Sequence, residues 1–286
     1  LRRNLFEALS AHIREAKKIP TLPETHLNKG SALHITPKWR LKTDDASVLK
    51  GVDLSKIDEV IIEISAHSSA DDFSFLPKEK VRLALPVIIR SQAIEKTVHH
   101  LYEHGYHKWQ IGNWGGLRLI PSKAETDIDF DSTVPVLNTQ AVAFADEAGA
   151  GGITCSPEDT YDNIQKLLSS SLHTTLIVYQ DTPLFLSANC IRPNTCADCT
   201  HQTERYTLST GKERFEAVSK ECLTTVIKNE PFYIGHLINN LSPEWLRMDF
   251  CNRAYTSAQI NRLIQIIQAG KPLKSSYSGN FKKSFA

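Results

Sequence analysis

The sequence predicts an α/β barrel of the (β/α)8 TIM type, in which eight parallel strands close into a cylinder with helices between them. Short apolar runs alternate with helical patterns along the chain, and eight such runs are present. The chain has 286 residues, an ordinary length for one such barrel. The apolar runs are rich in β-branched residues and show no clean alternation, as expected for strands buried on both faces.

The eight apolar runs are the predicted strands. They span residues 32–35, 59–64, 82–89, 109–111, 133–137, 152–154, 175–179 and 245–249. Strand–helix alternation favours a parallel sheet with right-handed crossovers, and eight strands favour closure over an open sheet.

The helical patterns carry recognisable end signals. Residues 91–104, 138–148 and 256–269 are each followed by a glycine, which readily adopts the left-handed conformation that ends a helix. Residues 156–169 open with Ser-Pro-Glu-Asp, which predicts an N-cap serine and a proline at the first helical position. An amphipathic helix is also expected over residues 1–18.

Residues 181–240 depart from the alternation of strands and helices. They contain four cysteines and a hairpin signal, in which the runs 205–208 and 213–218 flank Gly211. We interpret the chain as a single barrel domain over residues 1–286, with residues 181–240 as a cysteine-rich, metal-binding insertion after the seventh strand. Loops that follow barrel strands lie on the face where active sites form, so the insertion is expected there.

The four cysteines of this insertion have the spacing Cys190-x5-Cys196-x2-Cys199-x22-Cys222. A Cys-x2-Cys pair directs two thiolates at one metal from a tight turn, and two further cysteines complete a four-thiolate shell. Such a shell suits either tetrahedral zinc or a cubane iron–sulfur cluster, and the spacing leaves both open. The alternative is four cysteines that bind no metal.

The net charge and the apolar runs of the sequence limit the partners and the cellular location that we expect. The formal net charge of +1 provides no global field that favours nucleic acid or a membrane surface. No apolar run is long enough for a transmembrane helix and no signal peptide is evident, so we expect a cytoplasmic protein with reduced cysteines and no membrane contact. The chain begins without Met, so it is expected to be a fragment of a longer protein.

Barrel geometry brings the residues that follow each strand to one face. These residues are His34, Glu63, His67, Arg90, Asn113, Trp114, Asn138, Cys155, Glu158, Tyr179 and Asp249. Six of them are our catalytic candidates: Arg90, Asn138, Cys155, Glu158, Tyr179 and Asp249. For each one alone a structural role is the stronger expectation. Residues 112–116 form a glycine-rich loop whose Trp114 is suited to stacking on a ring.

Several short stretches resemble the peptidase U32 family, the collagenase-like proteases. They are residues 135–139, 152–158, 178–179 with 183–184, the cysteine run, Cys222 with 227–229, 247–250 and 279–283. The resemblance covers about residues 110–286, and the family's Gly-Ala-Asp-Ala-Val-Tyr-type opening is missing. It implies a barrel fold and, as in several members, a [4Fe–4S] cluster on the four cysteines. The chain is then expected to be a second or C-terminal barrel.

The resemblance leaves the activity open, because some members are called proteases and others resemble RNA hydroxylation enzymes or accessory proteins of oxygen-independent quinone hydroxylation. We therefore expect an iron–sulfur-dependent hydroxylation or modification enzyme, or an accessory factor, acting on RNA or a small aromatic molecule. A U32-type peptidase, that is a hydrolase, is the alternative, although neither a Ser-His-Asp nor a His-Glu-x-x-His signature is present. A non-catalytic, zinc-stapled binding module is the third possibility. The substrate and the oligomeric state stay open.

Overall fold

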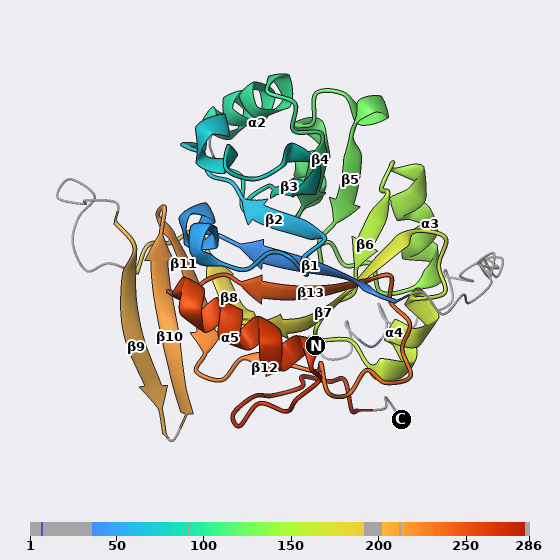
Figure 1. The fold of residues 1–286 in the computed structure, drawn as a ribbon, viewed down its shortest axis with the longest axis vertical. Helices are drawn as coiled ribbons and strands as arrows, with labels where there is room; N and C mark the ends of the chain where they lie inside the picture. The colour runs from blue at the N-terminus through green and yellow to red at the C-terminus, as the bar shows by residue number, and fades with distance from the viewer. Residues whose placement is uncertain (1–6, 8–35, 91, 192–201, 212, 284–286) are drawn as a thin grey trace.

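The computed structural model describes residues 7, 36–90, 92–191, 202–211 and 213–283 (Figure 1). It confirms a closed barrel of eight parallel strands in the order β1-β2-β3-β4-β5-β6-β7-β13, with β13 pairing back onto β1. The strands are β1 (Lys38–Thr43), β2 (Glu59–Glu63), β3 (Val81–Ala84), β4 (Lys108–Ile111), β5 (Asp127–Phe130), β6 (Gly152–Thr154), β7 (His173–Gln180) and β13 (Trp245–Phe250).

Helices lie between the barrel strands (Figure 1). The α-helices are α2 (Ala93–Glu103), α3 (Thr139–Glu147), α4 (Tyr161–Leu167) and α5 (Ser257–Gln268). Shorter 3-10 helices fill other connections: η1 (Ala46–Gly51), η2 (Ala70–Phe73), η3 (Lys78–Lys80), η4 (Trp114–Arg118) and η5 (Lys123–Glu125). The glycines predicted to end α2, α3 and α5 all have left-handed φ angles. No helix in the described part of the chain is both long and apolar enough to cross a membrane.

Two predicted elements differ from the structure, and two others lie almost wholly outside the described residues. The strand predicted over residues 133–137 is wrong, because this stretch, which contains Pro135, follows β5 as a loop. The helix predicted to start at Ser156 starts later, with the Thr160 side chain capping α4 by accepting a hydrogen bond from the Asn163 amide. Residues 1–18 and 32–35 hold a predicted helix and strand, but only Glu7 of them is described; the first barrel strand observed is β1.

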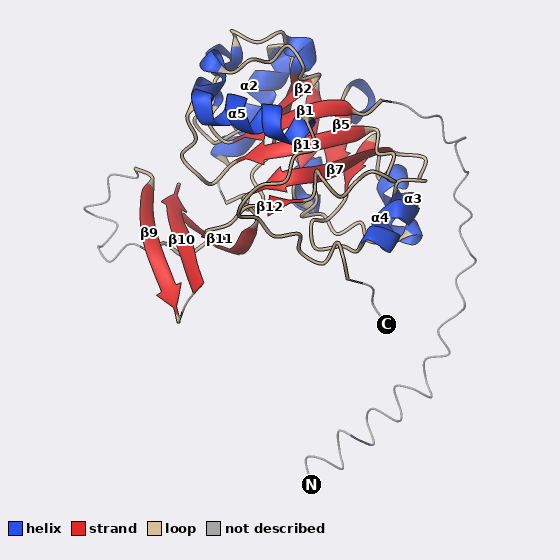
Figure 2. Ribbon diagram, turned by 60° about the horizontal axis from the view of Figure 1, so that its bottom comes forward, coloured by secondary structure: helices blue, strands red, loops and turns tan. Residues whose placement is uncertain are grey.

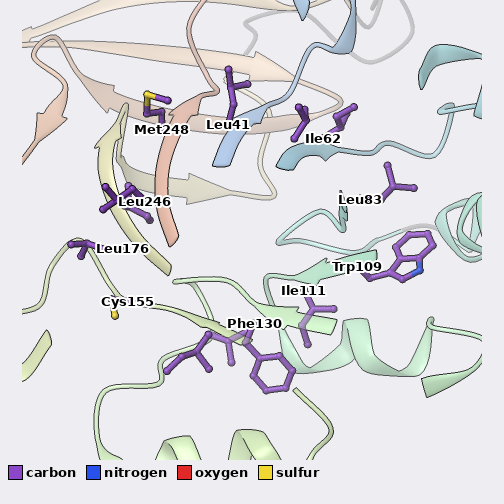
Figure 3. Packing of buried hydrophobic residues seen from close by; sticks show 14 of the residues in the cluster. Leu41, Ile62, Leu83, Trp109, Ile111, Phe130, Cys155, Leu176, Leu246 and Met248 are labelled. Atoms are coloured by element: carbon purple, nitrogen blue, oxygen red, sulfur yellow. The ribbon is translucent and has the colours of Figure 1, made fainter. Parts of the chain in front are cut away.

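Several barrel strands alternate charged or polar with apolar residues, although no clean alternation was expected from the sequence. In β1 the charged residues Lys38, Arg40 and Lys42 alternate with Trp39 and Leu41. Similar alternation of charged or polar with apolar residues recurs in β3, β4, β5 and β13. The apolar set packs in the main hydrophobic core, part of which Figure 3 shows. The charged set pairs across the barrel, so the barrel interior is ionic.

A network of ion pairs lies inside the barrel around Arg40. The Arg40 guanidinium contacts Glu59 Oε1 at 2.9 Å and Asp129 Oδ2 at 2.7 Å, and all three side chains are nearly inaccessible to solvent. Arg82 Nε also contacts Glu59 Oε1, at 2.8 Å. Because β1 and β5 are not neighbours in the sheet, the pair of Arg40 and Asp129 spans the interior. Each charge of this network therefore has a partner, which burial requires.

Between β7 and β13 the chain forms a second, antiparallel sheet in the order β8-β11-β10-β9 (Figures 1 and 2). Its strands are β8 (Pro183–Ser187), β9 (Glu204–Thr210), β10 (Glu213–Lys220) and β11 (Leu223–Lys228); the short β12 (Phe232–Tyr233) then pairs with β7. The predicted hairpin around Gly211 is β9 and β10, and Gly211 has a φ of 58°. Glu221 and Cys222 turn β10 into β11 with φ values of 51° and 61°, as a two-residue hairpin turn requires.

Candidate functional site

A cleft of about 840 Å³ lies at the carboxyl ends of the barrel strands, between the barrel mouth and the second sheet. From the barrel its lining includes Lys42, Glu63, Asp131, Gln180, Asp249 and Cys251. From the second sheet it includes Leu186, Arg205, Val218, Lys220, Leu223 and Thr225. This is the end of an α/β barrel where active sites form, and we call it the mouth cleft.

The floor of the mouth cleft is an ionic network centred on Asp131. Lys42 Nζ lies 2.5 Å from Asp131 Oδ2, and Arg247 Nη1 lies 2.9 Å from Asp131 Oδ1. Burial alone would raise the pKa of Asp131, but the charges of Arg247 and Lys42 hold it well below its usual range. Asp131 is therefore ionised at neutral pH. Arg247 Nε also contacts Asp249 Oδ1 at 2.7 Å.

Two other carboxyls of the cleft behave in the opposite way. Burial raises the pKa of Glu63, against the opposing charge of Lys42. Burial likewise raises the pKa of Asp249 despite the nearby charges of Arg247 and Lys42. Within the part of the chain that the structure describes, the Glu63 carboxyl makes no hydrogen bond or ion pair. A carboxyl of raised pKa that faces a cleft is suited to donate a hydrogen bond or transfer a proton.

The neighbouring Cys251 is not suited to be a nucleophile. Its side chain is buried, and burial, followed by the charges of Asp44 and Glu63, raises its thiol pKa well above the usual value. The thiol is therefore neutral at physiological pH. Cys155 lies in the hydrophobic core, where burial raises its pKa to about 12, and it does not line the mouth cleft.

Of the six catalytic candidates predicted from the sequence, Asp249 lines the mouth cleft. Tyr179 lies behind it and shares a 2.8 Å hydrogen bond with the hydroxyl of Tyr255, which does line it. Burial and then the charge of Asp181 raise the Tyr179 pKa to about 12. Arg90 donates a hydrogen bond to the Ala188 carbonyl at 2.9 Å and so holds the chain that leads to Cys190.

The other predicted residues stand outside the cleft. Asn138 Oδ1 accepts a hydrogen bond from the Ala141 amide at 2.8 Å and caps α3. Glu158 is exposed, and its backbone carbonyl accepts from Asn280 Nδ2 at 2.9 Å. Trp114 packs on Phe130 and Phe144, with ring centroids 5.1 and 5.2 Å away. Asn113 caps η4 and His67 is not part of the lining, whereas His34 lies outside the described residues.

Lys42, Asp131 and Arg247 are site residues that were not among the candidates predicted from the sequence. Their signal is the alternation of charged and apolar residues in β1, β5 and β13, which identifies a polar barrel interior. Asp131 was not recognised as a strand end because the fifth strand was expected over residues 133–137, whereas β5 ends at Phe130, directly before Asp131.

Two of the four predicted metal-binding cysteines are described, and both lie at one end of the second sheet. Cys190 Sγ lies 3.7 Å from the Ser219 hydroxyl near the end of β10. Cys222 is in the turn that leaves β10 two residues after Lys220. Cys196 and Cys199 lie outside the described residues.

This cysteine-bearing end of the second sheet borders the mouth cleft. Glu221 and Leu223, on either side of Cys222, line the cleft, as does Thr203 just before β9. Glu204, the first residue of β9, is paired with Ser219, so the segment from Cys190 to Glu204 leaves and rejoins the sheet at this end. Cysteine side chains are the ligand type that soft metals and iron–sulfur clusters prefer, and Cys190 and Cys222 are the two described at this end. Among the described residues alone, no group of three or more His, Cys, Asp or Glu is placed to hold a metal ion.

Comparison with known proteins does not assign the chain to a family. No protein-family model matches the sequence, no curated protein matches it, and no solved structure matches the fold. Because a barrel of this kind supports many chemistries, function must be argued from the mouth cleft and the cysteines themselves.

Proposed function

We propose that this chain is a barrel protein of the peptidase U32 type that binds a [4Fe–4S] cluster through Cys190, Cys196, Cys199 and Cys222. In this proposal it is a hydroxylation or modification enzyme, or an accessory factor, and it acts on RNA or a small aromatic molecule in the mouth cleft. The observation that carries the proposal is that Cys190 and Cys222 share one end of the second sheet, at the rim of a cleft with an ionisable floor.

The donor set agrees with such a cluster. Four thiolates are the usual ligands of a cubane cluster, and Cys190 and Glu204, which precede and follow Cys196 and Cys199 in the sequence, both lie beside Ser219. A bound cluster would supply or accept single electrons at the rim of the mouth cleft. Zinc would fit the same thiolates, but it would supply no electron.

The residues of the mouth cleft would bind and orient the substrate. Phe250 and Tyr255, whose ring centroids are 5.2 Å apart, both line it and provide an aromatic wall for a planar ring. Gln180 Nε2 donates to Asp249 Oδ2 at 2.9 Å, which fixes the amide that faces the ligand. Glu63 would donate a hydrogen bond or a proton to the substrate, because burial favours its neutral form.

Metal analysis of anaerobically purified protein tests the proposal. The wild type is expected to be brown and to contain iron and acid-labile sulfide, whereas Cys222→Ser loses both. Cys251→Ser is the matched control, since Cys251 is a buried cleft residue that follows β13 and is not one of the four predicted ligands, and it is expected to keep the iron. A wild type that stays colourless and free of iron after anaerobic reconstitution refutes the cluster.

The same preparation separates the alternatives. Stoichiometric zinc in a colourless protein would favour a zinc-stapled binding module. Cleavage of gelatin or peptides that persists in Cys222→Ser would favour a hydrolase whose reacting groups lie in the mouth cleft, because a metal closed by four thiolates has no open position for catalysis.

A further inference from the structure

The second sheet is not part of the main hydrophobic core. That core contains buried residues from all eight barrel strands and the α-helices, but none from the described part of residues 183–228. Ala217, Val218 and Ile227 of the second sheet are buried but are not members of that core. Figures 1 and 2 show the same separation, with β9 and β10 lying to one side of the barrel. An element with little shared apolar surface is free to move relative to its neighbour.

One end of the second sheet is tied to the barrel covalently. The chain enters the second sheet at Pro183 and leaves it after Lys228. These entry and exit points are adjacent, because Pro183 pairs with Ile227. Arg253, which follows β13, secures this end by donating to the Lys228 carbonyl at 2.9 Å and to Asp181 Oδ1 at 3.0 Å. This end therefore has the connectivity of a hinge.

The remainder of the sheet is tied to the barrel by polar contacts. At the end opposite the hinge, Lys220 Nζ lies 3.1 Å from Asp44 Oδ2. Nearer the hinge, where Glu216 is paired with Ile227, Glu216 accepts from Arg253 Nη1 at 3.2 Å; within the sheet it also accepts from Arg205 Nη1 of β9 at 2.6 Å. Arg205 also donates to the Asn252 carbonyl at 2.6 Å. The side chains of these ion pairs are 17–42% exposed, so water and salt reach them.

We propose that the four-stranded sheet β8–β11 is a hinged lid over the mouth cleft, and that its latch is the Lys220–Asp44 ion pair together with the Arg205 contact to Asn252, which the Glu216 ion pair supports. Opening of the lid would expose the cleft floor while the barrel stays folded. The barrel is expected to stay folded when the lid opens, because salt weakens the ion pairs of the latch but does not weaken the apolar core of the barrel. The inference is independent of the chemistry proposed above, because it concerns only how the two sheets are joined.

Cys251 is a built-in reporter of this motion. It lines the mouth cleft and is 8% exposed, so an alkylating reagent reaches it readily only when the lid lifts. Cys155, which is 1% exposed within the barrel core and outside the cleft, reports unfolding of the barrel itself. Peptide mass spectrometry after timed iodoacetamide labelling measures both rates in one sample of the full chain.

The test compares the wild type with Lys220→Met/Glu216→Gln. The double variant is expected to label Cys251 about tenfold faster, with the Cys155 rate unchanged. Loss of the Lys220 cation does not favour the thiolate of Cys251, so faster labelling reports access rather than intrinsic reactivity. Glu213→Gln is the matched control: it removes a carboxylate from the exposed end of the same strand and should leave both rates at their wild-type values.

Varying the salt concentration tests the latch a second time, without a substitution. Raising the ionic strength is expected to speed the labelling of Cys251 in the wild type, and to have little effect in the double variant, which lacks the latch. Equal Cys251 rates in the wild type and a folded double variant would overturn the proposal. If the double variant unfolds and exposes Cys155, the wild-type salt arm decides: a Cys251 rate that is insensitive to salt overturns the lid.

Discussion

Asp131→Asn tests the ionic floor of the mouth cleft most directly. The Asp131 carboxylate is the shared partner of Lys42 and Arg247, and its side chain is only 6% exposed. Replacing it with an amide leaves the buried Lys42 ammonium without its ion-pair partner and leaves Arg247 with Asp249 alone. Removing one partner from a buried ion pair typically costs about 3–5 kcal/mol. Since asparagine retains one hydrogen-bond acceptor, we expect the lower value, which corresponds to a fall in Tm of roughly 6–12 °C for a chain near this size.

The pH dependence of this loss carries a definite sign. The folded-state pKa of Asp131 lies well below its unfolded value, so the carboxylate stabilises the fold above the unfolded pKa and loses that contribution as pH falls through the acid range. Thermal and urea unfolding of the wild type and Asp131→Asn should therefore differ most at neutral pH, and the two curves should converge below about pH 4.

Asp127→Asn is the control for this prediction. Asp127 contacts Arg82 Nη2 at 2.7 Å, but its side chain is 47% exposed and Arg82 keeps its second partner, Glu59. Solvent screening therefore limits its expected cost to about 1 kcal/mol or less. If Asp131→Asn is as stable as Asp127→Asn at neutral pH, the reasoning that charges fill the barrel interior as obligatory pairs is refuted.

Three further substitutions give distinct readouts. Glu63→Gln should stabilise the protein more at pH 7 than at pH 4, because the raised pKa of Glu63 makes its ionisation oppose folding; urea midpoints of the variant and the wild type at the two pH values check this. The same substitution should reduce any proton-transfer activity of the mouth cleft by about 10²-fold or more. Asn138→Ala should cost about 1 kcal/mol through loss of the α3 cap, with ligand binding in the mouth cleft unchanged, and a change in affinity would restore Asn138 as a site residue. Gly152→Ala should destabilise by about 1–3 kcal/mol in thermal unfolding, since its new Cβ would lie 2.5 Å from Asp129 Oδ1, whereas Gly211→Ala, with no atom within 4 Å of its Cβ, would bear only the cost of its positive φ.

Local signals predicted the helices well, because their causes are local. The glycines after α2, α3 and α5 and the Thr256 cap of α5 act within one turn of the helix they end or begin. The hairpin around Gly211 is another local signal, and it is confirmed. The closed barrel was predictable from the number and rhythm of the apolar runs.

The mouth cleft could be predicted only in part, because its residues meet through long-range pairing. Lys42 and Asp131 are 89 residues apart, and Arg247 is a further 116 residues along from Asp131. Nothing near Asp131 in the sequence shows which cation neutralises it. A search for strand-like segments with charge at every second position would have found β1 and β5, and with them the cleft floor.

The charged interior also constrains which strand pairings the barrel can adopt. Successive side chains of a strand face opposite sides, so a slip of one residue in β1 would turn Arg40 and Lys42 outward, into the apolar layer beneath the helices, and Leu41 into the ion-pair network. A barrel filled with interchangeable aliphatic residues would tolerate such a slip far better. In this chain a slip of one residue would leave several buried ions without partners, so the charged interior disfavours that register.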